Sequence, residues 1–112
     1  MAYQKKLTMV RGNTFAFGMD LIGINQDLDT VYFTCRKSER GDVVFQKSLG
    51  HGVEKVEDNQ HIENYQYRIR IAPEDTEDLS PGTYQYDLEI GVNSDVYTLL
   101  RGTLTIVMDI TR

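Results

Sequence analysis

The side chains that could bind a metal or act as a nucleophile are few in this sequence and lie far apart. His51 and His61 are the only histidines, both in stretches rich in glycine or polar residues, and Cys35 is the only cysteine. A zinc site needs four protein ligands, or three and a water, and no cysteine accompanies the histidines. We therefore expect both histidines in solvated loops. Cys35 is expected as a small buried residue of a strand, since nothing near it in the sequence would stabilise a thiolate.

Two clusters of acidic residues are the next candidates for chemistry. Asp75, Glu77 and Asp78 form one cluster, and Glu57 with Asp58 forms the other. Neither has the spacing of oxygen ligands around a central glycine that a calcium loop requires, so we interpret both as solvated corners. The sequence predicts no metal site and no cofactor.

Catalysis by hydroxyl or carboxyl groups finds little support in the sequence. No serine lies in a nucleophile elbow, and no glycine-rich phosphate loop is present. A pair of carboxylates for glycoside hydrolysis stays open at this stage, because any two can meet in space. Asp87 and Glu89 share the polar face of a predicted strand and are more simply explained as solubilising residues. We predict no catalytic residues and a protein that is not an enzyme.

The seven tyrosines are the remaining candidates, because aromatic side chains are enriched at interfaces and can stack on sugars. Tyr32 and Tyr97 are out of phase with the apolar residues of their segments and are therefore the possible contact residues. The alternative, which the sequence leaves open, is two ordinary exposed tyrosines. The tyrosines that share the phase of neighbouring apolar residues, and are expected in the core, are Tyr65, Tyr67, Tyr84 and Tyr86.

Strands must position these residues, because apolar side chains alternate with polar ones along most of the chain. About seven or eight such segments follow one another at the spacing of roughly 8–12 residues that is typical of antiparallel sandwiches and barrels. Residues 75–79 are expected to make one turn of helix, with Pro73 and Glu74 at its start, and no long helical period appears elsewhere. The predicted strands are residues 7–10, 14–21, 30–37, 42–48, 53–56, 63–72, 84–92 and 96–107.

Three of these predictions concern how the strands are arranged. Residues 84–92 and 96–107 are expected to form a central antiparallel hairpin, with a turn at Asn93, Ser94 and Asp95. The short, charged segment 53–56 is expected at a sheet edge, where its charges would discourage aggregation. In residues 42–48, Val43 is expected on the same face as Phe45.

The residues around Tyr84 favour a sandwich over a barrel. Tyr84 begins a strand after a short Ser-Pro-Gly corner, which is the spacing of a tyrosine corner, where the hydroxyl bonds to the backbone a few residues upstream. Tyr86 stands where antibody domains have a cysteine, and the chain has no tryptophan to pack on it. The alternative is that Tyr84 is an ordinary apolar strand residue. We predict an all-β fold, an antiparallel immunoglobulin-like β-sandwich.

Length and composition limit the class of protein. The 112 residues are 40% hydrophobic and 26% charged, which fits one globular domain over residues 1–112 rather than a disordered chain. The net charge is −5 and no stretch is strongly basic, so we expect no nucleic-acid partner. No apolar run approaches the ~20 residues that cross a bilayer, and the N-terminus lacks the apolar core of a secretory signal, so we expect no membrane partner.

Three parts of the sequence stand out by their order and spacing. They are residues 10–15 (Val-Arg-Gly-Asn-Thr-Phe), residues 73–76 (Pro-Glu-Asp-Thr) with 81–88 (Pro-Gly-Thr-Tyr-Gln-Tyr-Asp-Leu), and residues 97–106 (Tyr-Thr-Leu-Leu-Arg-Gly-Thr-Leu-Thr-Ile) with 109–111 (Asp-Ile-Thr). Together they resemble the baseplate upper protein N-terminal family, immunoglobulin-like domains of phage and prophage tails. Multi-domain members of that family continue into further tail domains, whereas this sequence ends at Arg112.

The resemblance implies a non-enzymatic structural module that helps to assemble a phage or prophage tail, such as a baseplate, through protein–protein contacts. It implies synthesis in the bacterial host cytoplasm and a final place in the virion tail. The implied partners are other tail proteins and further copies of the chain in a homo-oligomer. The alternative is a stand-alone adhesive or carbohydrate-binding sandwich that uses the exposed aromatic side chains of Tyr32 and Tyr97.

Overall fold

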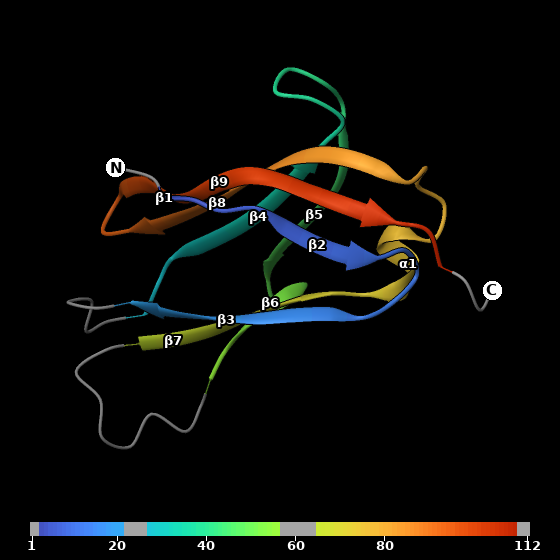
Figure 1. Ribbon diagram of the computed structural model, residues 1–112. Coiled ribbons are helices and arrows are strands. Elements are labelled where there is room, and N and C mark those ends of the chain that lie inside the picture. The colour runs from blue at the N-terminus through green and yellow to red at the C-terminus, as the bar shows by residue number, and fades with distance from the viewer. Residues whose placement is uncertain (1–2, 22–26, 57–64, 110–112) are drawn as a thin grey trace.

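The computed structural model describes residues 3–21, 27–56 and 65–109, which form nine strands and one short helix (Figure 1). His61, Glu57 and Asp58 lie outside the described residues, as does most of the predicted turn at 22–29. The elements are, in chain order, β1 Tyr3–Gln4, β2 Leu7–Val10, β3 Phe15–Leu21, β4 Thr30–Arg36, β5 Val43–Leu49, β6 Gly52–Lys55, β7 Tyr65–Ile71, α1 Pro73–Thr76, β8 Gly82–Val92 and β9 Asp95–Val107.

The strands lie in two layers, and the backbone pairing runs from one layer into the other (Figure 1). The order is β1-β9-β8-β4-β5-β6-β7-β3, with β2 also pairing with β9. In immunoglobulin nomenclature, β9-β8-β4-β5 correspond to the G-F-C sheet with its additional strand, and β3-β7-β6 to strands of the opposite sheet. The predicted all-β, immunoglobulin-like sandwich is confirmed, and the two-residue strand β1 was not foreseen.

β6 connects the two layers. It pairs in parallel with β5, where Ser48 lies opposite Gly52 and Leu49 opposite Val53, and antiparallel with β7. The prediction of an edge strand here was therefore wrong. Gly50 and Gly52 have φ angles of 81° and 102°, which let the chain make a tight loop and continue in the same direction beside the end of β5.

The core between the layers is built around Phe33 of β4, which is fully buried. Its ring stacks on Tyr86 of β8 at a centroid distance of 5.2 Å and meets Phe17 of the opposite layer edge-on at 5.8 Å. These rings fill the place that a tryptophan and a disulfide occupy in antibody domains. Cys35 is buried as predicted, as are Tyr67, Tyr84 and Tyr86; the side chain of Tyr65 is outside what the structure describes.

The central hairpin and the helix are close to the expected positions. β8 and β9 are joined by Asn93 and Ser94, whose φ angles of 53° and 69° are those of a two-residue hairpin turn of type I′. α1 lies at Pro73–Thr76, beginning at Pro73 as expected and ending before Leu79. The carboxylate of Asp75 accepts a 2.7 Å hydrogen bond from the Ala72 amide and holds the first turn there. Within the described residues no helix is long and apolar enough to cross a membrane.

Candidate functional site

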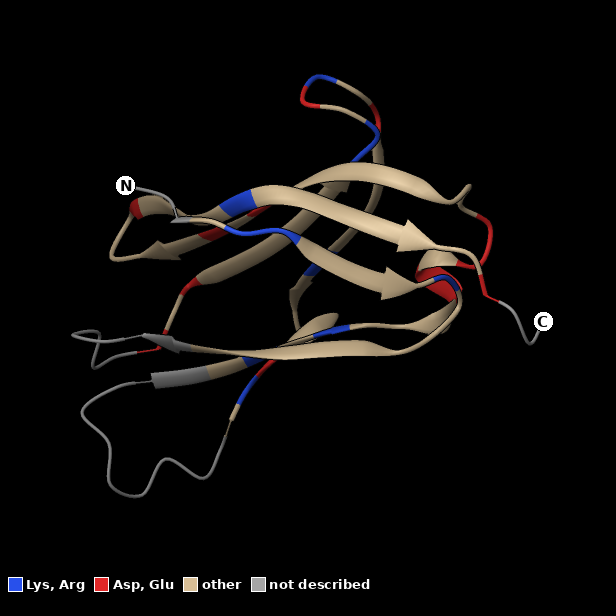
Figure 2. Ribbon diagram, in the orientation of Figure 1, with Lys and Arg blue, Asp and Glu red and all other residues tan. Residues whose placement is uncertain are grey.

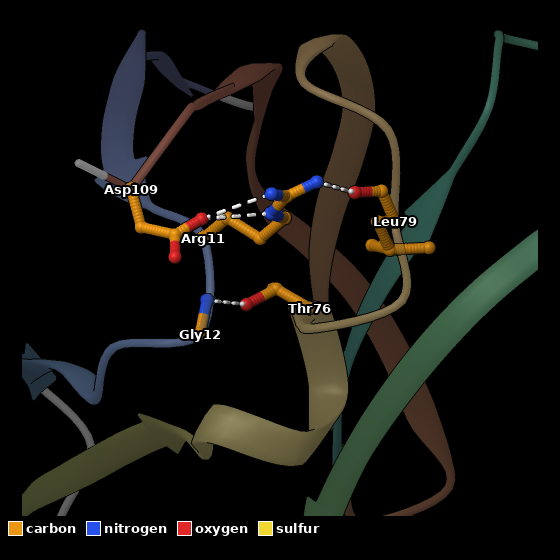
Figure 3. Close-up of polar contacts among 5 residues, drawn as sticks. All are labelled: Arg11, Gly12, Thr76, Leu79 and Asp109. Atoms are coloured by element: carbon orange, nitrogen blue, oxygen red, sulfur yellow. Dashed lines mark hydrogen bonds and ion pairs between the residues drawn. The ribbon is translucent and has the colours of Figure 1, made fainter. Parts of the chain in front are cut away.

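The chain passes from one layer to the other between β2 and β3, and a group of polar contacts holds it there. We call Arg11, Gly12, Thr76, Leu79 and Asp109 the crossover cluster (Figure 3). Nε and Nη2 of Arg11 both lie 3.0 Å from Oδ1 of Asp109, and Nη1 donates to the carbonyl oxygen of Leu79 at 3.5 Å. The buried amide of Gly12 donates to Oγ1 of Thr76 at 2.8 Å.

The crossover cluster brings together residues from three distant stretches of the sequence. Arg11 and Gly12 come from the first stretch, Thr76 from the second, and Asp109 from the third. The Asp109 side chain is only 8% exposed and that of Arg11 28%, so this ion pair is shielded from solvent. These contacts thus hold together the segment between β2 and β3, the end of α1 and the residues that follow β9.

Two further contacts position the corner before β8. The hydroxyl of Tyr84 donates a 2.6 Å hydrogen bond to the carbonyl oxygen of Ser80, which is the contact that defines a tyrosine corner. Asp75, half-buried, accepts from Nζ of Lys47 at 2.6 Å in addition to its bond from the Ala72 amide. Asp75 is therefore part of the folded scaffold, whereas Glu77 and Asp78 are exposed, as expected of a solvated corner.

The segment containing β1 and β2 covers one side of β9. Lys5 lies between the two strands. Its backbone amide donates a 3.1 Å hydrogen bond to the carbonyl oxygen of Arg101, and its carbonyl oxygen accepts a 2.8 Å hydrogen bond from the hydroxyl of Tyr86. Gly102 lies directly beneath, and a β-carbon there would overlap the carbonyl oxygen of Lys5. The close approach therefore requires glycine at position 102.

β3 lies at the opposite end of the pairing order. It pairs with β7 along its whole length, and its other side pairs with no strand that the structure describes; we call that side the β3 edge. Ala16 and Gly18 are exposed, and Phe15, Phe17 and Met19 are half-buried against the core. Along these seven residues, alternate residues direct their backbone N–H and C=O groups away from β7, with apolar side chains alongside.

The outward face of β5, β4, β8 and β9 carries a shallow polar depression, which we call the outer groove. Two cavities of about 660 Å³ and 430 Å³ run into each other there, because Thr34, Arg36 and Asp87 line both. Across β4, β8 and β9 the pairing register places the outward side chains in three rows. The rows are Tyr32, Glu89 and Thr98; Thr34, Asp87 and Arg101; and Arg36, Gln85 and Thr103.

The structure separates the two predicted contact residues. Tyr32 is 37% exposed and lines the outer groove. Tyr97 is 49% exposed at the tip of the β8–β9 hairpin and does not line it. A register shift after Leu88 places Tyr97 opposite Ile90, a core residue, so the out-of-phase argument for Tyr97 was wrong. It is exposed because it lies near the hairpin tip.

The ionisable groups give no catalytic arrangement among the described residues. Burial raises the pKa of the Cys35 thiol from 9.0 to about 12, so it stays protonated at neutral pH. Burial also raises the pKa of Tyr86 above 10.0. His51 is exposed in the turn before β6, and no three metal-binding side chains gather anywhere in residues 3–21, 27–56 and 65–109.

Comparisons with known proteins identify the fold and leave the family open. No family model matches the sequence, and no curated protein matches it. A Bacteroides vulgatus protein described as a candidate glycoside hydrolase has a similar structure, with a TM-score of 0.52 and 15% identity over 94% of this chain. The present chain spans only 17% of that protein. The extracellular domains of the voltage-gated sodium channel beta4 subunit, known as a parallel homodimer, match with a TM-score of 0.42 and 13% identity, covering 98% of this chain and 96% of that one.

Proposed function

We propose that this protein is a non-enzymatic structural module of a phage or prophage tail, which assembles with its neighbours through protein–protein contacts. The observation that carries the proposal is the β3 edge. An unpaired strand edge is a ready template for a strand of another chain, and monomeric proteins usually protect such edges with lysines, prolines, bulges or very short strands.

Within residues 3–21, 27–56 and 65–109, the β3 edge has none of these protections. β3 is seven residues long, contains no lysine, arginine or proline, and carries only one charged residue, Asp20. Its pairing with β7 proceeds without a register shift from Phe15 to Leu21. A neighbouring subunit that added a strand here would pair with the backbone and cover the half-buried side chains of Phe15, Phe17 and Met19.

The assignment to a tail is supported by the sequence resemblance. Residues from the stretches that carry it meet in the crossover cluster, where their contacts hold the two layers together. The proposed partners are other tail proteins and further copies of this chain in symmetric arrangement, within the virion tail after synthesis in the host cytoplasm. The net charge of −5 agrees with protein partners rather than nucleic acid.

A double variant, Ala16→Lys with Gly18→Lys, tests the proposal. Both positions are exposed on β3, so the lysines should leave the fold intact while opposing an incoming strand. We expect loss of oligomers in light scattering and loss of the protein from purified virions. Thr83→Lys, at an exposed position of β8 far from the β3 edge, is the matched control and should assemble normally. A wild-type protein that is strictly monomeric and never enters a virion would contradict the proposal.

A further inference from the structure

We propose that the outer groove binds an oligosaccharide, with Tyr32 as the surface on which one sugar ring stacks. This inference rests on the outward face of β4, β8 and β9 and not on the β3 edge or on the tail assignment. Three observations carry it: the mixture of polar groups in the groove, their fixed positions, and the full pairing of the strands that form its floor.

The groove presents hydrogen-bond donors and acceptors side by side. In the middle row, Thr34, Asp87 and Arg101 supply a hydroxyl, a carboxylate and a guanidinium. Neighbouring strands lie about 4.8 Å apart, and outward side chains follow each other at about 6.6 Å along a strand, so the groups form a regular lattice. A sugar hydroxyl both donates and accepts, and adjacent hydroxyls of one ring can therefore be met by groups of opposite character.

Several of these side chains are already held in place. Thr34 is only 7% exposed, and its hydroxyl accepts a 2.9 Å hydrogen bond from Nε2 of Gln46. Nη1 of Arg36 donates to the carbonyl oxygen of Gly41 at 3.2 Å. Asp87 is half-buried between its neighbours on the sheet. Binding to such a surface costs little side-chain entropy, which favours recognition of a polar ligand by a shallow site.

The same geometry disfavours other classes of ligand. A peptide could add to a sheet only at a free edge, whereas β4 and β8 are paired on both sides. The groove mixes basic residues (Lys5, Lys6, Arg36 and Arg101) with the carboxylates of Glu39, Asp87 and Glu89, so it lacks the purely basic surface that a phosphate backbone favours. Small apolar molecules prefer enclosed, apolar pockets, and this depression is open and lined with polar groups. A hydroxyl-rich chain that lies across the strands fits best.

The test is a binding assay with defined oligosaccharides, using the whole chain. A panel of immobilised neutral, uronate-bearing and phosphate-bearing oligosaccharides is screened, and each hit is titrated by calorimetry. We expect at least one hit, and Tyr32→Ala and Asp87→Ala should each weaken its affinity about tenfold or more. Tyr32→Phe, which keeps the ring, should retain most of the affinity. Tyr97→Ala, at a tyrosine that is even more exposed but lies outside the groove, is the matched control and should leave affinity unchanged.

The outcomes separate this inference from the proposed tail function. It is overturned if no oligosaccharide on the panel binds, if an acidic peptide included as a probe binds in preference, or if affinity falls with Tyr97→Ala and not with Tyr32→Ala. Circular dichroism confirms that each variant is folded before binding is measured. The double variant at Ala16 and Gly18 should keep full affinity, so a failure of tail assembly and a failure of sugar binding are distinguishable.

Discussion

The segment from Tyr3 to Leu21 supplies the strands at both ends of the pairing order, β1 and β2 at one end and β3 at the other. The two edges differ in length and in charge. β1 and β2 cover β9 with strands of two and four residues, interrupted by Lys5 and Lys6. β3, which follows the crossover cluster, is seven residues long and has no basic residue (Figure 2). Short strands and lysines are protections against edge-to-edge pairing, so among the described residues the first edge is blocked and the second is left open. This difference between the two edges is what the proposed assembly through the β3 edge depends on.

Among the substitutions that compare the two edges, Gly102→Ala is expected to change the free energy of unfolding most. Gly102→Ala would place a methyl group against the carbonyl of Lys5, so the β1–β2 segment must shift and its hydrogen bond with Tyr86 is lost. We expect a loss of about 2–4 kcal/mol in the free energy of unfolding, from overpacking plus one hydrogen bond. Denaturant unfolding followed by circular dichroism measures it.

Gly18→Ala is the matched change on β3. A β-carbon there meets nothing closer than the carbonyl oxygen of Tyr67 at 3.9 Å. Alanine should therefore stabilise the protein by about 0.5 kcal/mol, because glycine in a strand costs conformational entropy. Equal effects at the two glycines would show that the two edges are not constrained differently.

The second effect concerns the crossover that separates the edges. Arg11→Leu removes the ion pair with Asp109 and the hydrogen bond to Leu79. We expect a loss of about 1–2 kcal/mol, since hydrogen bonds to charged, shielded groups are worth more than exposed ones. Arg40→Leu, at an exposed arginine in the β4–β5 turn, is the control and should change stability by less than about 0.5 kcal/mol. Similar losses for the two arginines would contradict a special role for the crossover cluster.

The alternation of apolar residues was enough to predict most of the fold. It located the strands, the buried tyrosines and Cys35, because side chains of a regular strand alternate between core and solvent. It failed where the register shifts. Val43 was expected beside Phe45 in the core, yet it is 46% exposed, because the pairing of β4 with β5 skips one residue after Cys35. The skipped residue is Val44. Beyond such a residue, side chains of the strand change from one face of the sheet to the other, and the sequence pattern does not show where this happens.

The candidate sites depend on partners that the sequence does not specify. Tyr32 was correctly identified as exposed, but its neighbours in the outer groove come from β5, β8 and β9, up to about 70 residues away in the chain. Likewise, nothing in residues 15–21 indicates that β3 has one free side, because the pairing order is a property of the whole topology. The local sequence pattern therefore predicts the strands, whereas the outer groove and the β3 edge depend on how the strands pair with one another.

A smaller effect is expected from the hydroxyl of Tyr86, which ties the blocked edge to the core. Tyr86→Phe keeps the ring and its stacking on Phe33 and removes only the hydrogen bond to Lys5. We expect a loss of about 1 kcal/mol and faster hydrogen exchange at the Lys5 amide. Tyr84→Phe removes the corner bond to Ser80 instead and should leave exchange at Lys5 unchanged. Faster exchange at Lys5 in both variants would mean that the two hydroxyls stabilise the sandwich as a whole.

The smallest effect, and the most specific, is the contribution of Tyr86 to the pH dependence of stability, which is absent at neutral pH and appears only in alkaline solution. Burial raises its pKa above 10.0, so the unfolded chain loses this proton before the folded one does, and stability falls as pH rises above 10.0. The Cys35 thiol, whose pKa is raised from 9.0 to about 12, adds a decline of the same sign. Because that decline is common to wild type and Tyr86→Phe, the difference between their unfolding curves isolates the phenol. We expect the stability gap between them to be constant below about pH 9 and to narrow above pH 10.0. A gap that stays constant at every pH would show that the Tyr86 phenol ionises as readily in the folded chain as in the unfolded one, and would contradict the raised pKa.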